Sequence, residues 1–246
     1  MPEVIPVSPL SRVKIEQRAL DFLRHDHPEL IAKPGWYPAE ALFDGPELEN
    51  HGFTYAVTDF PPGCEGITDF ISKECVLATS VYNQLKLQLP RARASAIHEF
   101  SHVLLHSNQI NYAIQEGRSI VKMERSTLPS YIDPEWQANY MTAALMMPLP
   151  HMIELVSTGV TDPEIVMKLF GVSRQAAEIR LKVTNEFMQK NGPLVNRGHI
   201  MHRKSNVPGM GSGFDLPSND KDQAARTAVG SQSLIPPPFR TRRLPP

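Results

Sequence analysis

The segment Ala94–His106, ASAIHEFSHVLLH, constrains the fold of this chain more than any other part of the sequence. Its apolar residues recur at helical spacing, and helix residues four positions apart lie on the same face. His98 and His102 therefore project together, and Glu99 follows the first of them. Two imidazoles at this spacing can hold one metal ion, and the carboxylate can reach a water molecule beside it. The segment predicts a helix over residues 90–107 that carries a metal site.

A simpler explanation is that these histidines are core residues whose ring nitrogens are satisfied by hydrogen bonds. The context favours the metal site, because the same helix carries apolar residues that can pack it against a sheet. His106 is not expected to share the ion, since eight residues at 1.5 Å each place it about 12 Å along the axis from His98. We expect His106 to support the site or to pack beside it.

The third ligand has one main candidate, in the segment DPEWQANYMTAALMMP at residues 133–148. Asp133 can cap a helix, Pro134 suits its first position, and Glu135 then projects from the first turn. A catalytic zinc site has three protein ligands and one open position, so one carboxylate would complete it. Glu135 could equally be a first-turn residue that interacts with the helix dipole. Both interpretations are open at this point.

The remaining patterns predict an α+β fold. Residues 9–33 are spaced as one amphipathic helix that ends at Pro28, and residues 51–82 alternate as a three-stranded antiparallel sheet. Helical spacing returns over residues 133–147, where Pro148 and Pro150 stop it. Two further helices are predicted in residues 161–189, with Asp162-Pro163 at a start and Gly171 at a turn. These two helices form a helical hairpin or a helix-turn-helix.

Composition suggests three parts: a metal-binding α+β domain over residues 1–150, a helix-turn-helix-like segment over 151–191, and a tail over 192–246. The tail contains eight Lys or Arg, three Asp and eight of the 23 prolines, so we expect it to be basic and disordered. No apolar run approaches the roughly 18 to 20 residues of a membrane span, and the N-terminus lacks a signal-peptide pattern. A cytoplasmic protein without membrane contact is expected. Cys64 and Cys75 should be free, buried or half-buried thiols.

The segments HEFSHVLLH and EWQANYMTAALMMP, about thirty residues apart, resemble the ImmA/IrrE family of metallopeptidases. That family has His-Glu-x-x-His on one helix and a Glu-x-x-Ala-Asn helix that ends in Leu-Met-Pro. The stretch FGVSRQAAEIRL at residues 170–181 is similar to a segment that commonly follows the peptidase core, while EGITD at residues 65–69 fits more loosely. Tyr140-Met141 replaces the usual Phe-Ala, which is a packing change away from the ligands.

The resemblance implies a zincin-like fold with a gluzincin-like zinc site formed by His98, His102 and Glu135, with Glu99 as the general base. Manganese or iron would also accept two histidines and a carboxylate. It further implies an endopeptidase whose substrate is a helix-turn-helix transcriptional repressor, so that cleavage relieves repression in stress response or mobile-element control. The oxyanion-stabilising residue is not assigned, and the candidates are Tyr112, Tyr131, Tyr140, His106 and His151.

Two other functions compete with the peptidase. The first is a DNA-binding regulator with a structural or vestigial metal site, in which residues 166–181 form the helix-turn-helix. Its second helix offers only Arg174, Arg180 and Lys182, and residues 1–191 carry a net charge of about −6, which suits phosphates poorly. Direct nucleic-acid binding is therefore not expected. The second is a catalytically silent module that sequesters a repressor.

Overall fold

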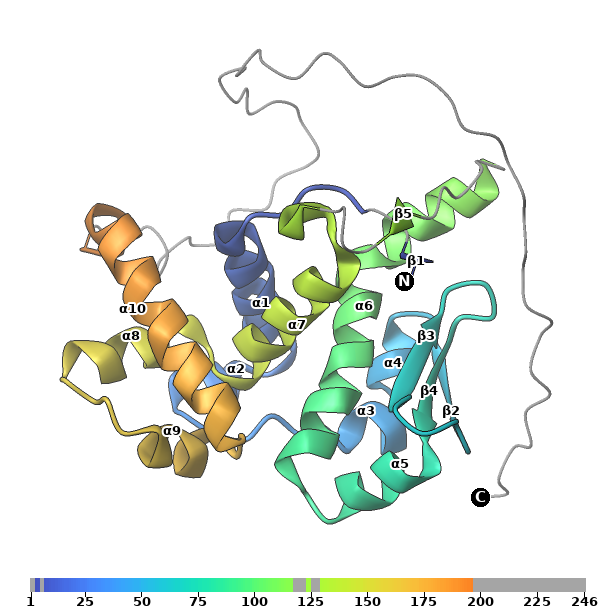
Figure 1. Cartoon of the computed structure of the whole chain (residues 1–246), viewed down its shortest axis with the longest axis horizontal. Coiled ribbons are helices and arrows are strands. Elements are labelled where there is room, and N and C mark those ends of the chain that lie inside the picture. Colours follow the sequence, from blue (N-terminus) through green and yellow to red (C-terminus); the bar gives the residue numbers. More distant parts are fainter. Residues whose placement is uncertain (1–2, 5–6, 117–122, 125–128, 197–246) are drawn as a thin grey trace.

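A computed structural model describes residues 3–4, 7–116, 123–124 and 129–196. The protein is mixed α+β, mostly helical, with a small three-stranded sheet, which confirms the predicted class. The helix α6 (Pro90–Gln115) lies between the sheet on one side and α1 (Arg12–Asp26) and α7 (Pro134–Met146) on the other (Figure 1). Among the described residues, no helix is long and apolar enough to cross a bilayer.

Four helices precede the sheet in the sequence. The predicted helix over residues 9–33 is divided into α1 and α2 (Pro28–Ala32), because Pro28 ends one helix and occupies the first turn of the next. Two four-residue helices follow, α3 (Ala41–Asp44) and α4 (Glu47–Asn50). They were not predicted, since one helical turn is too short to show a period of 3.6 residues.

The sheet differs from the expected antiparallel one. Its strands are β2 (Thr54–Thr58), β3 (Gly66–Asp69) and β4 (Glu74–Ala78), in the order β2-β4-β3. β3 and β4 are antiparallel, but β2 and β4 are parallel, so the prediction of an antiparallel sheet was wrong for this pair. Alternating apolar residues reveal strands and not their order, and here β4 inserts between the first two. The third strand also ends at Ala78, where α5 (Thr79–Lys86) begins.

The two helices predicted to carry the candidate ligands are present. α6 runs eight residues further than predicted, to Gln115. Before α7 the chain forms a 3-10 turn, η2 (Ser130–Ile132), and the Asp133 side chain then accepts the N–H of Glu135 at 3.0 Å. Pro134 follows at the first position, as expected. Two short strands, β1 (Glu3–Val4) and β5 (Met123–Glu124), pair with each other in antiparallel fashion.

The last part consists of α8 (Leu149–Ser157), α9 (Pro163–Phe170) and α10 (Arg174–Asn196). The start of α9 is as predicted, since Asp162 caps it, and Gly171 adopts the left-handed conformation at φ 62° before α10. α8 was not predicted. α10 also extends to Asn196, so residues 192–196, assigned to the tail, are helical. The rest of the predicted tail, 197–246, lies outside the described residues.

Buried polar contacts join these helices to the rest of the protein. Arg180 of α10 is 2% exposed and donates to both carboxylate oxygens of Glu16 on α1, at 2.6 and 3.1 Å. Arg93 of α6 donates to the carbonyl oxygens of Gly171 and Tyr37. One apolar cluster also includes residues from α1 through α10. Among the described residues this cluster continues across residue 150, and the domain division after that residue stays a prediction.

Candidate metal centre

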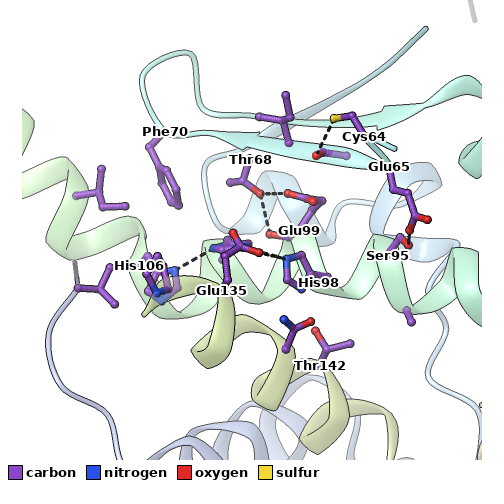
Figure 2. A pocket seen from close by; sticks show the side chains of 18 of the residues that line it. Cys64, Glu65, Thr68, Phe70, Ser95, His98, Glu99, His106, Glu135 and Thr142 are labelled. Carbon is purple, nitrogen blue, oxygen red and sulfur yellow. Dashed lines mark hydrogen bonds and ion pairs between the residues drawn. The ribbon is translucent and has the colours of Figure 1, made fainter. Parts of the chain in front are cut away.

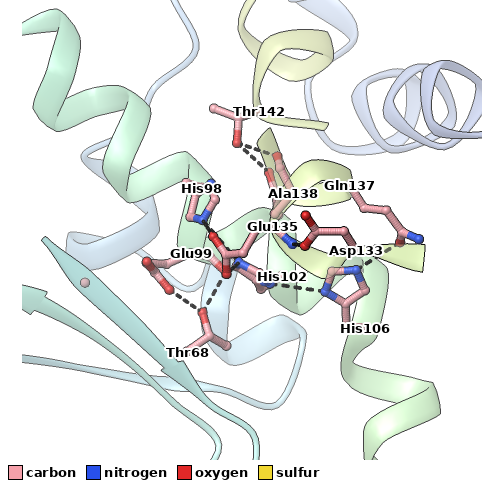
Figure 3. Close-up of polar contacts among 12 residues, drawn as sticks. Thr68, His98, Glu99, His102, His106, Asp133, Glu135, Gln137, Ala138 and Thr142 are labelled. Carbon is pink, nitrogen blue, oxygen red and sulfur yellow. Dashed lines mark hydrogen bonds and ion pairs between the residues drawn. The ribbon is translucent and has the colours of Figure 1, made fainter. Parts of the chain in front are cut away.

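Three side chains converge between α6 and α7 (Figure 3). His98 and His102 extend from α6, with 3.1 Å between their Nε2 atoms. Glu135 approaches from the first turn of α7, with Oε2 at 3.3 Å from His98 Nε2 and Oε1 at 3.3 Å from His102 Nε2. Among the described residues, these three form the one group of His, Cys, Asp and Glu that could hold a metal ion. The sequence prediction had named all three.

The spacing of the three donor atoms suits a zinc ion. Donors 2.0 to 2.1 Å from a tetrahedral ion are separated from one another by about 3.3 to 3.4 Å. The observed separations of 3.1, 3.3 and 3.3 Å lie close to that value. Zinc accepts imidazole nitrogen and carboxylate oxygen as ligands, and manganese and iron accept them too. The residues present therefore fit such an ion.

Electrostatics within the group favour a negatively charged glutamate. Hydrogen bonds from His102 and His98 lower the pKa of Glu135, and this effect exceeds the opposing effect of burial. Burial lowers the pKa of His98, but the hydrogen bond and charge of Glu135 and the charge of Glu99 outweigh it and raise that pKa above 6.5. A negative carboxylate beside two imidazoles is the charge arrangement that a divalent cation needs.

Glu99 lies on the sheet side of α6 and contacts β3. The Thr68 hydroxyl is 2.7 Å from Glu99 Oε2, to which it donates, and 3.0 Å from the Glu99 carbonyl oxygen. A Cβ atom on Gly66 would lie 2.9 Å from Glu99 Cγ and 3.0 Å from the Val76 carbonyl oxygen, so the carboxylate occupies space that only glycine leaves. Burial raises the pKa of Glu99, and the neighbouring histidines oppose that rise.

A second layer of polar side chains lies behind His102. Its Nδ1 is 3.2 Å from Nδ1 of His106, whose Nε2 is 3.1 Å from Oε1 of Gln137. His106 and Gln137 are both fully buried, and burial together with the charge of His102 lowers the pKa of His106 to about 3. His106 thus lies beside a candidate ligand and is not one of the three converging groups, in agreement with the sequence analysis.

The site opens into a cleft of about 870 Å³ between the sheet and the two helices (Figure 2). Beyond Glu99 on one side, Glu65 accepts hydrogen bonds from Ser95 and from Arg91. The wall of the cleft also includes apolar side chains, among them Val7, Phe70 and Ile110. His98, Glu99, His102 and Glu135 all line the cleft, so an extended ligand within it would reach the three converging groups and the carboxylate.

Most candidates for an oxyanion-stabilising residue lie elsewhere. Of the five, only His106 is among the residues that line the cleft, and both of its ring nitrogens already have partners. His151 contacts the Leu30 carbonyl oxygen at 2.9 Å on another side of the core. Tyr140 lies near Arg180, and the rings of Tyr112 and Tyr131 are about half exposed.

Sequence analysis missed three residues that shape the site: Gly66, Thr68 and Gln137. The first two belong to EGITD, a stretch whose similarity to the family had been noted, so that stretch was the available signal. Gln137 gave no signal, because two of its three partners, His106 and Ser8, are 31 and 129 positions away in the sequence.

The cleft is lined by both histidines and the glutamate of the His-Glu-x-x-His segment and by a second glutamate from another helix. Residues 81–182 match the family model of the IrrE N-terminal-like domain, Peptidase_M78. This match confirms the resemblance to the ImmA/IrrE family over residues 81–182. The matched segment begins in α5 and ends within α10. It therefore includes His98, Glu99, His102 and Glu135, together with α8, α9 and the first part of α10.

No curated protein is significantly similar to the chain. A solved structure described as a Mycobacterium tuberculosis transcriptional regulator is similar at a TM-score of 0.39 and 14% identity, over 69% of this chain. The match covers 50% of that protein, so the chain spans about half of its length.

Proposed function

We propose that this protein is a zinc-dependent endopeptidase that hydrolyses a peptide bond in a protein substrate. The observation that carries the proposal is the convergence of His98, His102 and Glu135 within a cleft that Glu99 also lines. Three protein ligands leave one position open, as catalytic zinc sites do, whereas a structural site would be closed by a fourth ligand.

In this proposal the ligands and the base have separate roles. Zinc at the site supplies Lewis-acid polarisation of the peptide carbonyl and makes water acidic near neutral pH. Glu99 accepts the proton of the attacking water and then delivers it to the leaving amine. Thr68 donates to Glu99 Oε2 at 2.7 Å, so this hydroxyl holds one carboxylate oxygen while the other is free for proton transfer.

The substrate is expected to bind as an extended strand along β3. In the part of the chain that the structure describes, β3 pairs only with β4, and its other edge faces outward from the sheet. Gly66, Ile67 and Thr68 of this strand line the cleft. An extended peptide that pairs with this edge through main-chain hydrogen bonds would pass in front of Glu99.

We propose a helix-turn-helix transcriptional repressor as the substrate, and this rests on the family resemblance. The alternative in which α9 and α10 bind DNA loses support from the side chains. Arg180, one of three basic residues on which that alternative depended, is buried against Glu16. Arg174 forms an ion pair with Glu164, which neutralises its charge. Little positive charge then remains beside Lys182 for contact with phosphates.

Metal content tests the proposed centre. Wild-type protein and Glu135→Ala are purified in parallel, supplied with zinc, desalted, and measured by elemental mass spectrometry. Near-stoichiometric zinc in the wild type and a sharp decrease in the variant are expected, because two imidazoles alone bind zinc weakly. Little zinc in the wild type after supplementation would contradict the proposal.

Cleavage tests the reaction itself. A peptide library made from a bacterial proteome is incubated with the zinc-loaded wild type or with Glu99→Gln, and new termini are identified by mass spectrometry. The variant should keep its zinc and lose cleavage. Equal sets of new termini in both samples would rule out Glu99 as the base, and an absence of cleavage by wild type on purified candidate repressors would favour the sequestering module.

A further inference from the structure

A further carboxylate, outside the group of three converging side chains, lines the cleft. Glu65 directly precedes β3, and its main chain is fixed to the sheet because its carbonyl oxygen accepts the N–H of Ala78 at 3.0 Å. In the view of Figure 2, Glu65 lies beside Ser95 of α6, and both are on the opposite side of Glu99 from Phe70. Glu65 takes no part in the zinc binding or the proton transfer proposed above.

Two side chains of α6 set the position of the Glu65 carboxylate. The Ser95 hydroxyl donates to Oε2, and Nε of Arg91 donates to Oε1 at 2.7 Å. The side chain of Glu65 is 34% exposed, so most of it is removed from solvent. Burial raises the pKa of Glu65, but the hydrogen bonds from Ser95 and Arg91 outweigh this effect and lower that pKa below 4.5. The carboxylate is therefore negatively charged at neutral pH.

The cation that pairs with Glu65 is less fixed than the carboxylate itself. The side chain of Arg91 is 79% exposed, against 34% for Glu65. An ion pair with so exposed a partner contributes little net free energy, because the charge gives up hydration and the long side chain gives up conformational freedom. A cation brought by a ligand can therefore displace Arg91 from Glu65, while Ser95 keeps the carboxylate in place.

The spacing along β3 relates Glu65 to the reacting bond. Glu65 is three residues before Thr68, whose hydroxyl donates to Glu99. At about 3.3 Å per residue, about 10 Å of extended chain separates these two positions. A peptide that pairs with β3 and presents its scissile bond to Glu99 thus brings a residue two or three positions from that bond close to Glu65.

We propose that Glu65 is a specificity-determining residue that binds a lysine or arginine side chain of the substrate, two or three residues from the scissile bond. This rests on the proposed function, which supplies the scissile bond and the path of the peptide along β3. The ammonium or guanidinium group of the substrate takes the place of Arg91 and donates to Glu65 Oε1, while Ser95 retains Oε2. A glutamate or aspartate at the same substrate position is disfavoured, because its charge would face that of Glu65.

The sequences around cleaved bonds give the first test. The peptide library is digested with zinc-loaded wild type, and Lys and Arg should be enriched at one position two or three residues from the cut. A synthetic peptide with that residue should have a kcat/KM about 3- to 10-fold higher than the same peptide with glutamine there. Cleavage without this enrichment would overturn the proposal. So would enrichment of Asp and Glu, which is the result expected if Arg91 and not Glu65 contacts the substrate.

Two variants should change this ratio of kcat/KM values in opposite directions. Glu65→Gln removes the charge, so the ratio should fall to about 1, whereas Arg91→Ala removes the competing cation and should raise the ratio above that of wild type. Glu49→Gln is the matched control, because Glu49 is an exposed glutamate on α4 that does not line the cleft, and its ratio should stay as in wild type. An unchanged ratio in Glu65→Gln would refute the role of Glu65. If Glu65→Gln does not fold by circular dichroism, a ratio in Arg91→Ala no higher than that of wild type contradicts the proposal.

A binding measurement separates this proposal from a failure of the proposed function. Random peptides displayed on phage are selected on full-length Glu99→Gln and on the Glu99→Gln/Glu65→Gln double variant, so no cleavage is needed. Peptides selected by the first protein should contain more Lys and Arg than those selected by the second. If this difference is present but wild type neither holds zinc nor cleaves peptides, the subsite stands and the peptidase fails. Equal contents of Lys and Arg would overturn the subsite whether or not wild type is a peptidase.

Discussion

Removing one partner of the buried ion pair between Glu16 and Arg180 should cause one of the largest losses of stability that a single substitution produces in this protein. The two side chains are each 2% exposed, and Arg180 also donates to the Met147 carbonyl oxygen at 2.8 and 3.1 Å. Replacing Arg180 with methionine leaves a buried carboxylate without its cation. Removal of one partner from a buried pair costs about 3 to 5 kcal/mol. At about 2 to 4 °C per kcal/mol in a protein of this size, the melting temperature should fall by roughly 6 to 20 °C.

The assay is urea unfolding followed by far-ultraviolet circular dichroism, with a double-mutant cycle. Arg180→Met should lose the full amount, whereas Glu16→Leu combined with Arg180→Met should be more stable than Arg180→Met alone, because no charge remains buried. Arg174→Met is the matched control: it changes the same residue type on the same helix, but its side chain is 55% exposed. We expect a change within about 0.5 kcal/mol there.

Two results would refute this reasoning. Equal losses of stability in Arg180→Met and Arg174→Met would show that burial of the pair has no special cost. A double variant that loses the sum of the two single effects would show that the two side chains are not coupled.

Three further predictions concern other contacts. Gly66→Ala places a Cβ 2.9 Å from Glu99 Cγ, so peptide cleavage should fall about 10- to 100-fold with zinc content unchanged, whereas Gly35→Ala, which meets only the flexible Leu30 side chain at 3.2 Å, should keep activity. Gly171→Ala adds a side chain at a residue whose φ is 62°, and its Cβ would lie 2.5 Å from Trp36 Cδ2. Thermal unfolding should therefore show a loss of stability larger than the roughly 1 to 2 kcal/mol that the left-handed backbone conformation alone costs. Burial lowers the pKa of His27, but Glu47 at 3.1 Å and Glu29 raise it above 6.5 overall, so its stabilising contribution is present below that pH and is lost as pH rises through the folded pKa. The stability difference between wild type and His27→Gln should therefore be larger at pH 5.5 than at pH 8.5, and a difference that grows with pH would contradict the assignment.

Local signals in the sequence predicted the elements that carry the site. The spacing of His98 and His102 requires a helix, and Asp133-Pro134 marks the start of the next one, so both ligand-bearing helices could be located without a structure. The direction in which Glu135 projects was not determined by these signals. It depends on how α7 packs on α6, where Ser101 and Thr142 meet at 3.2 Å.

The parts that could not be predicted depend on distant contacts. Alternation identified β2 and β4 as strands, but their parallel pairing results from the position of β4 between β2 and β3. Gln137 reads as an ordinary polar helix residue, and its place in the site follows from the segment around Ser8, which lies 129 positions away. Sequence analysis of one chain finds periodicity and spacing, whereas strand order and buried hydrogen-bond chains come from the assembled core.

The long-range buried contacts also bear on when the protein can complete its folding. Glu16 meets Arg180 across 164 positions, and Arg93 meets Gly171 across 78. Contacts between distant parts of a chain form late, because a large loop must close first, and domains emerge from the ribosome with the N-terminal part first. The helix that carries His98, Glu99 and His102 is synthesised before α10, but the set of long-range buried contacts can be completed only after α10 has been synthesised. A chain truncated after residue 150 should thus accumulate as a folding-defective product rather than as a free-standing catalytic module.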